Sequence, residues 1–309
     1  MFLTKHPPIS LTDTLFQLGT PAFPAFLSMG DFGMLIEGGT GPTFPIILEQ
    51  IRILGISPEK IKYILLTHTH ADHIGGIPHF KRIWPHIEII GSTNADRIFQ
   101  KKELFHEYIV ADTAIAQLMK AKEEITDLPP ILIDYHFGLD SRVKEGDKID
   151  LGKGISWDVY ETPGHSPCHI SLFDKTEGTL VIGDATGFYV PEKDALWPNY
   201  FVSLEDYVNS IRKLATLPAK RAVLSHNWVI FGKVRLHLEH AMSATEKYHR
   251  EVLERLASGE SAERIAMDQA RFVDSITDIQ PFRIMYDLSK LMISRSQKAN
   301  LNLSFSLEN

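Results

Sequence analysis

The sequence predicts an α/β protein in which short buried strands alternate with helices. Three observations carry this expectation: short apolar runs bounded by turn residues, other segments whose apolar residues recur at helical spacing, and the alternation of the two along the chain. The order departs from a regular strand–helix–strand repeat, because hairpin-like strands precede the first helix. We therefore expect a layered α/β body rather than a doubly wound sheet.

The N-terminal part of the chain is expected to form hairpin strands, one helix and further buried strands. The strands are predicted at 14–18, 26–29, 34–37, 61–66 and 87–90, and the helix at 42–54. Met29-Gly30-Asp31-Phe32-Gly33 suits a tight turn between two of the strands. Gly55 is expected to end the helix.

The rest of the chain adds helical segments to this pattern. Residues 92–128 have helical spacing, end at Pro129-Pro130 and are interpreted as an insertion. Strands are predicted at 149–151, 156–161, 169–173, 179–182 and 222–224, with a helix at 204–214. From about Lys233 the chain is expected to be helical to its end. We therefore predict a main domain over 1–232 and a C-terminal helical extension over 233–309.

Composition limits the classes of partner and compartment. At 309 residues the chain has room for one large domain, or for one domain with an appendage. A net charge of −7 argues against nucleic acid or an anionic membrane as the main partner. Cys168 is the only cysteine, which excludes an intrachain disulfide and a thiolate-rich zinc site. With no apolar stretch typical of a signal peptide or a membrane span, we expect a cytoplasmic protein.

A histidine-rich run directly after the predicted strand 61–66 is the most informative motif. It reads Thr67-His68-Thr69-His70-Ala71-Asp72-His73. His68 and His70 are two residues apart, which places side chains on one face of an extended backbone. Imidazole is the commonest metal ligand, and a nearby carboxylate can hold a second ion. A histidine-rich surface loop is the alternative, but so many ligand-type residues at one strand end favour a metal site.

Three other predicted strands also end in a ligand-type residue. His165 follows the turn sequence Thr162-Pro163-Gly164, Asp184 follows Gly183, and His226 follows Ser225. Each one alone could be a turn or helix-capping residue. Their repetition at successive strand ends favours a shared metal site.

These motifs resemble those of the metallo-β-lactamase superfamily. His-x-His-x-Asp-His, Thr-Pro-Gly-His, Gly-Asp and Ser-His occur in the family's order, over roughly residues 10–230. The resemblance implies a four-layer αββα sandwich. Within the superfamily, the chain resembles the glyoxalase II and thioesterase members more than the antibiotic-hydrolysing ones, because Asp184 stands where many of the latter have cysteine or serine. The segments 92–128 and 233–309 are most similar in architecture to the quinolone-signal response type, and we expect them to wall or cover the active site.

The resemblance also implies two divalent metal ions and their ligands. It assigns His68, His70 and His165 to one ion, Asp72, His73 and His226 to the other, and Asp184 to both. The two ions would share a bridging hydroxide that attacks the substrate, and would stabilise the oxyanion. Asp72 and Asp184 are the expected catalytic residues, with Asp72 a candidate proton acceptor. The ligand types favour zinc and iron almost equally, and manganese is also compatible with them.

The loop after Asp184 carries the candidate substrate-binding residues. These are the aromatic residues Phe188, Tyr189, Trp197 and Tyr200. For any one of them, packing of the loop onto the core is an equally good interpretation. Gly187 occupies the position at which the lactonase relatives have their tyrosine, which weakens an acyl-homoserine-lactone lactonase hypothesis. The residues that hold glutathione in glyoxalase II are not found either.

The resulting hypothesis is a binuclear metal-dependent hydrolase that cleaves a small-molecule thioester or ester. One alternative is a signalling or effector protein of the quinolone-response type with weak hydrolase activity. Another is an iron-dependent persulfide dioxygenase. The expected partner is a small-molecule acyl substrate, not nucleic acid or a membrane, and a homodimer is compatible with the apolar residues of 92–128.

The remaining ligand-type residues receive supporting or structural roles. Cys168 is expected to be buried, and His169 to support the site without binding metal. Glu37 is interpreted as a turn carboxylate, with orientation of the site loop as the alternative. The other histidines are expected at the surface or at an interface: His79, His86, His106, His136, His237, His240 and His249.

Overall fold

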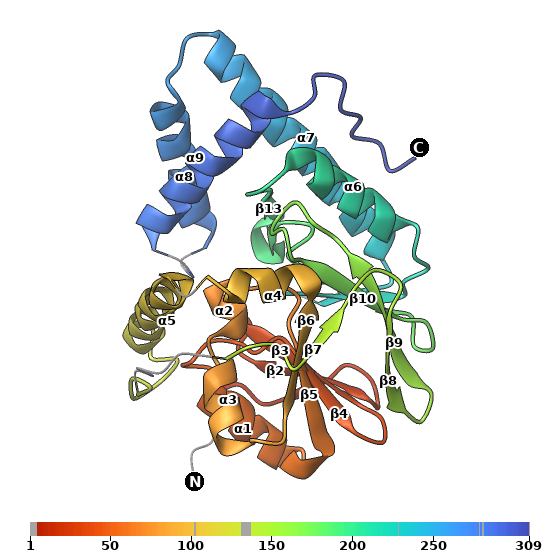
Figure 1. Cartoon of the computed structure of the whole chain (residues 1–309). Coiled ribbons are helices and arrows are strands. Elements are labelled where there is room, and N and C mark those ends of the chain that lie inside the picture. The colour runs from red at the N-terminus through yellow and green to blue at the C-terminus, as the bar shows by residue number, and fades with distance from the viewer. Residues whose placement is uncertain are drawn as a thin grey trace. The chain divides into compact units, whose positions relative to one another are not determined.

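The computed structural model describes residues 5–101, 103–130, 137–227, 229–277, 279 and 281–308. The chain forms two compact units, Met1–Val159 and Tyr160–Asn309 (Figure 1). The sequence predicted a boundary between residues 232 and 233, with the main domain before it and the C-terminal helical extension after it. A division into compact units does not test that boundary, which stays a prediction. Among the described residues, no helix is both long and apolar enough to cross a membrane.

The first unit is built on one sheet whose strands follow in chain order. They are β1 (Ile9–Ser10), β2 (Leu15–Gly19), β3 (Pro24–Met29), β4 (Gly33–Ile36), β5 (Ile61–Leu65), β6 (Glu88–Ser92) and β7 (Ser141–Val143). β1 to β4 pair antiparallel, and β4 to β7 pair parallel. The carboxyl ends of β4 and β5 therefore meet at the same edge, with Ile36 opposite Leu65.

Helices make the crossovers of the parallel half. They are α1 (Phe44–Ile53), α2 (Ala71–Ile74), α3 (Ile77–Ile83), α4 (Thr93–Phe99) and α5 (Glu103–Ala121), with a 3-10 turn η1 (Pro58–Lys60) before β5. α1 has Pro45 in its first turn and is followed by Gly55 at a φ of 67°, as expected for a helix start and stop. The helical prediction for 92–128 was too long. α5 ends at Ala121, because Glu123 turns into the left-handed region at a φ of 58°.

A hairpin of β8 (Lys148–Gly152) and β9 (Ile155–Glu161) follows β7. Its turn needs left-handed backbone at Gly152, Lys153 and Gly154. Trp157 on β9 is fully buried and donates its indole N–H to Ser28 Oγ of β3 at 3.0 Å. β9 continues past Val159 into the second unit.

Within the second unit, four strands pair in the order β15–β14–β11–β10. They are β10 (Ile170–Asp174), β11 (Thr179–Gly183), β14 (Arg221–Leu224) and β15 (Val229–Phe231). β11 and β14 are parallel, and β10 and β15 are antiparallel to their neighbours. Every residue of β10 and β11 is buried, as expected of strands that are covered on both faces. A separate hairpin, β12 (Phe188–Val190) and β13 (Ala195–Trp197) around η2 (Pro191–Lys193), precedes α6 (Leu204–Ala215).

The C-terminal helices are α7 (Val234–Ala257), α8 (Ala262–Ile276) and α9 (Phe282–Lys298). α8 and α9 pack side by side (Figure 1). The prediction of helix to the end of the chain was wrong for 299–308. There the Asn300 side chain bonds the backbone N–H of Asn302 at 2.9 Å, in place of a helical bond. Arg212 of α6 holds this segment by donating to the carbonyls of Ser304 and Ser306.

Candidate metal centre

The first unit brings together the imidazoles of the histidine run. The chain after β5 is extended up to His70, which has φ −72° and ψ 151° directly before α2. His68 is fully buried and His70 half-buried, and His68 Nε2 lies 3.0 Å from His70 Nδ1. Two ring nitrogens therefore converge on one point, as the alternating spacing predicts.

The second half of the histidine run, including Asp72 and His73, lies in the short helix α2. His73 is buried, and its Nε2 lies 3.6 Å from Asp72 Oδ1. The ring of His73 also lies against that of His68, with centroids 4.1 Å apart. One strand end thus presents an imidazole pair and an adjacent imidazole–carboxylate pair.

Glu37 is a site residue that the sequence interpretation underrated. It follows β4, is 1% exposed, and has a left-handed φ of 71°. Thr67 Oγ1 donates to Glu37 Oε1, and Glu37 Oε2 lies 3.4 Å from His73 Nδ1. The carboxylate therefore orients two members of the histidine run. Its position at a strand end directly before Gly38-Gly39 was the available signal.

The bond from Thr67 also sets the tautomer of His68. Because the Thr67 hydroxyl donates to Glu37, its oxygen accepts from His68 Nδ1, 3.0 Å away. His68 then carries its proton on Nδ1 and keeps a lone pair on Nε2. This is the arrangement by which a carboxylate prepares an imidazole to bind a metal.

The second unit places Asp184 between two imidazoles. His165 Nε2 lies 3.3 Å from Asp184 Oδ2, and His226 Nε2 lies 3.8 Å from Asp184 Oδ1. All three side chains are buried. Parallel pairing of β11 with β14 aligns Gly183 with Leu224, so that Asp184 and His226 follow at the same edge. Each carboxylate oxygen therefore faces a different imidazole.

The turn before His165 requires glycine. Gly164 has a φ of 122°, and a Cβ there would lie 2.3 Å from the backbone nitrogen of Tyr207. His165 donates from Nδ1 to the carbonyl of Asn199 at 2.9 Å. This bond leaves the Nε2 lone pair directed towards Asp184.

His169 supports Asp184, as predicted. Its Nε2 accepts the backbone N–H of Asp184 at 2.9 Å, so Nδ1 carries the proton and donates to Thr162 Oγ1 at 2.8 Å. Thr162 continues the chain to Ser171, which donates to the carbonyl of Ile182. This buried network fixes the backbone at which Asp184 leaves β11. Cys168, also as predicted, is buried.

The donor chemistry fits a divalent transition-metal ion. The clustered atoms are imidazole nitrogens and carboxylate oxygens in buried positions, and within the first unit Glu37, His68 and His73 offer donor atoms within 4.8 Å of one another. Such a donor set suits zinc, iron and manganese.

Comparison with known proteins assigns the family. The model of the metallo-β-lactamase superfamily matches residues 27–226. The chain belongs to this superfamily. Family membership and the His/Asp clusters together support a metal-dependent hydrolase.

The chain is similar to proteins named as hydrolases. It is 28% identical over 210 residues to the probable metallo-hydrolase YqjP of Bacillus subtilis, covering 62% of this chain and 63% of that protein. It is 29% identical over 197 residues to the N-acyl homoserine lactonase AttM of Rhizobium radiobacter, covering 60% and 66%. The chain thus spans slightly less than two thirds of the length of these relatives.

A solved structure shows the same fold. It is that of a metallo-β-lactamase family protein from Thermus thermophilus, with a TM-score of 0.65 and 21% identity, covering 94% of this chain and 95% of the other. The metallo-β-lactamase fold predicted from the motifs is thereby confirmed, together with the helical C-terminal region.

The aromatic residues predicted to contact substrate occupy different environments. Phe188 lies against a proposed ligand, with its ring 5.4 Å from that of His226. Tyr189 is half-buried and packs against the ring of His237, while Trp197 is 4% exposed. Tyr200 is fully buried, and its hydroxyl lies 2.8 Å from Ser296 Oγ of α9. Of the four, Phe188 is therefore the one that lies beside the proposed ligand His226, and substrate contact stays a prediction for all of them.

The prediction for the remaining histidines was wrong for three of them. His79, His237 and His249 are buried. Burial lowers the pKa of His79 and of His237 to about 4, so both are neutral at physiological pH. His86 and His106 are exposed and His240 is half-buried, whereas His136 lies outside the described residues.

Asp112 of α5 is a half-buried carboxylate that nothing in the sequence indicated. It accepts the backbone N–H of Gly41 at 2.8 Å. A Cβ on Gly75, directly after α2, would lie 2.4 Å from its Oδ1. Asp112 thus ties α5 to the loop after β4 and to the end of α2. Burial raises its pKa to about 6, opposed by the bond from Gly41 and helped by the charge of Asp72.

Proposed function

We propose that this chain is a binuclear metal-dependent hydrolase of a small-molecule thioester or ester. The observation that carries the proposal is the placement of Asp184, whose two oxygens face His165 and His226 separately. The lactonase relative supports the bond class, because a lactone is a cyclic ester.

The proposed ligands are those of the sequence motifs. His68, His70 and His165 would bind one ion, Asp72, His73 and His226 the other, and Asp184 both. Convergence of the ligands within each unit supports this assignment, as does the family's motif order. Divalent ions bound there would acidify water to give a nucleophile near neutral pH and would polarise the scissile carbonyl. Zinc or iron is proposed, with manganese as a further option.

The chain's own residues orient this chemistry. Glu37 and Thr67 keep the Nε2 lone pair of His68 available. His169 fixes the backbone of Asp184. Asp72, which is half-buried at the start of α2, is proposed to accept the proton released as the nucleophile attacks. Phe188 would form an apolar wall for the acyl group beside His226.

The test is Asp184→Asn, assayed with a panel of acyl thioesters and lactones and by elemental analysis of protein purified without added metal. We expect loss of turnover by at least about a hundredfold, with the circular dichroism spectrum unchanged. The control is Asp206→Asn, an exposed carboxylate of α6, which should keep full activity. Full turnover of Asp184→Asn would overturn the mechanism.

The same preparations distinguish the alternative functions. Oxygen consumption with a persulfide substrate, in place of ester cleavage, would assign the site to persulfide oxidation. A cellular role that survives in metal-stripped protein would favour a signalling function. The proposal also retains a small-molecule acyl substrate and a reducing, cytoplasmic location, which the composition favours.

A further inference from the structure

The first unit contains a cleft that is separate from the proposed metal ligands. It lies between the start of α1, His79 of α3 and the segment 123–130 that follows α5, and we call it the α1–α3 cleft. Its volume is about 530 Å³, within the range of roughly 300–1,000 Å³ typical of small-molecule sites. None of the residues that line it is a proposed metal ligand.

The walls of the cleft are apolar and its floor is aromatic. The walls come from Pro42, Ile46, Ile125 and Leu128, among others. On the floor, the half-buried ring of Phe44 stacks on the imidazole of His79, with centroids 5.0 Å apart and planes 25° apart. Stacked aromatic faces attract both apolar groups and organic cations.

His79 is the buried polar group of this floor. It is 8% exposed, and its imidazole is among the groups that line the cleft. Its burial, with a smaller effect of Arg82, keeps the imidazole neutral near pH 7. A neutral imidazole can accept a hydrogen bond from a ligand without repelling a positive charge.

Carboxylates dominate the rim of the cleft. Glu49, Glu123, Glu124 and Asp127 line it, with Lys5 as the lining ammonium. Arg52 bonds both oxygens of Glu49, and Lys5 donates to the carbonyl oxygen of Glu123. Glu124 contacts His6. With Lys5, Arg52 and His6 all counted, the carboxylates of the rim still outnumber the cationic groups, and those of Glu123 and Asp127 are exposed. Such a rim favours a cationic head group and disfavours a carboxylate.

We propose that the α1–α3 cleft binds a small organic cation with an apolar body, such as an arylalkylamine. The apolar body lies against Phe44 and the proline and isoleucine walls. The ammonium group reaches the rim carboxylates and donates a hydrogen bond to His79. This site is independent of the proposed hydrolase function, because it uses no metal ligand.

Three probes with one apolar body test the charge preference. They are 4-phenylbutylamine, 4-phenylbutanol and 4-phenylbutyrate, titrated into the purified full chain at pH 7 and low salt by calorimetry. We expect the amine to bind best and the carboxylate at least about tenfold more weakly, with the difference shrinking as salt is added. Equal binding of all three probes, or no binding at millimolar concentration, would overturn the proposal.

Variants place the binding in the cleft. The double variant Glu123→Gln/Asp127→Asn should weaken the amine about threefold or more and leave the alcohol unchanged. His79→Phe keeps the stacked floor and should weaken both the amine and the alcohol. Ile125→Trp should fill the cleft and weaken all three. Glu107→Gln, which removes an exposed carboxylate outside the cleft, is the matched control; an equal loss in that control would contradict the assignment.

Discussion

At the scale of the residue, Glu37 keeps a backbone conformation that its side chain does not favour. A φ of 71° costs a residue with a Cβ roughly 1–2 kcal/mol relative to glycine. The strain is retained where the carboxylate receives the Thr67 hydroxyl and lies beside His73. This combination indicates that Glu37 is kept for orientation of the ligands, at a cost in stability.

Two substitutions of Glu37 separate its orienting role from its strain. Glu37→Gln keeps the size and the strain but weakens the carboxylate contacts, so we expect metal affinity to fall roughly 10–100-fold with little gain in stability. Glu37→Gly should lose metal affinity to a similar extent while relieving the backbone strain. Competition with a chelator measures the affinity, and urea unfolding of metal-free protein measures the stability. Unchanged affinity in both variants would show that Glu37 has no part in metal binding.

At the scale of the element, Asp112 couples α5 to the loops around the histidine run. The carboxylate fits between Gly41 and Gly75, where a Cβ would collide with it at either position. The predicted segment 92–128 therefore does more than cover the body. Through α5 it packs against the end of the helix that carries Asp72 and His73.

Asp112 also makes the stability of the metal-free protein depend on pH. Its pKa in the folded protein is about 6, above the ordinary value of 3.8. The carboxyl group therefore loses its proton at a lower pH in the unfolded chain than in the folded one. The folded state is favoured below pH 3.8, and this contribution is lost as the pH rises to about 6. We expect Asp112→Asn, in chelator, to be more stable than the wild type at pH 8 by up to about 3 kcal/mol, and equal to it near pH 4. The exposed Asp13→Asn should show no such pH dependence in urea unfolding.

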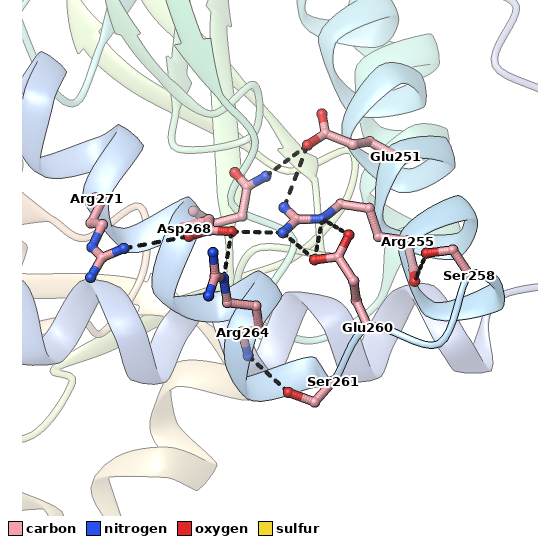
Figure 2. Close-up of polar contacts among 9 residues, drawn as sticks. Glu251, Arg255, Ser258, Glu260, Ser261, Arg264, Asp268 and Arg271 are labelled. Atoms are coloured by element: carbon pink, nitrogen blue, oxygen red, sulfur yellow. Dashed lines mark hydrogen bonds and ion pairs between the residues drawn. The ribbon is translucent and has the colours of Figure 1, made fainter.

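Arg255 joins α7 to α8 through a network of charged side chains (Figure 2). It donates to Glu260 and to Asp268, at 2.7 Å in each case, and lies 3.9 Å from Glu251. Ser261 caps α8 by accepting the backbone N–H of Arg264. These bonds raise the pKa of Arg255 and lower those of Glu260 and Asp268.

This network is expected to stabilise the α7–α8 turn more than an isolated surface pair would. Arg255→Ala should lower the free energy of unfolding by roughly 1 kcal/mol, since several partners are lost at once and solvent screens each of them. The effect should decrease at high salt. Arg283→Ala removes one exposed pair with Asp287 and is the matched control, with no measurable change expected. Equal effects of the two variants would show that the network has no collective contribution.

At the scale of the whole molecule, the proposed ligands come from segments that are far apart in the sequence. A metal ion that binds the folded chain but not the unfolded chain stabilises the folded state. The gain is about 2.7 kcal/mol for each ion when the free metal concentration is a hundred times its Kd. We therefore expect chelation to lower the melting temperature measured by calorimetry, and added zinc or iron to restore it. Asp184→Asn should lose most of this shift. A melting temperature that does not respond to chelation would contradict metal binding by these residues.

The sequence predicted the strands that carry the ligands well, because their signal is local. Apolar runs at 61–66 and 179–182 became β5 and β11 with shifts of one residue at their ends. Weak elements were missed, including α3 and the short hairpin of β12 and β13. α3 has only seven residues, Ile77–Ile83, too few for its apolar residues to show a helical repeat.

By itself the sequence determined the family, the ligand-type residues and the strand ends that present them, because motif order and apolar periodicity are properties of neighbouring residues. The supporting role of His169 was also predicted, but only the tertiary structure decided the roles of Glu37 and Asp112. Glu37 meets Thr67 across two strands, and Asp112 meets Gly41 from a helix 71 residues away. The burial of His79 was likewise invisible in the sequence. Such contacts depend on how distant segments pack, and packing sets burial, tautomer and pKa in ways that local sequence patterns do not encode.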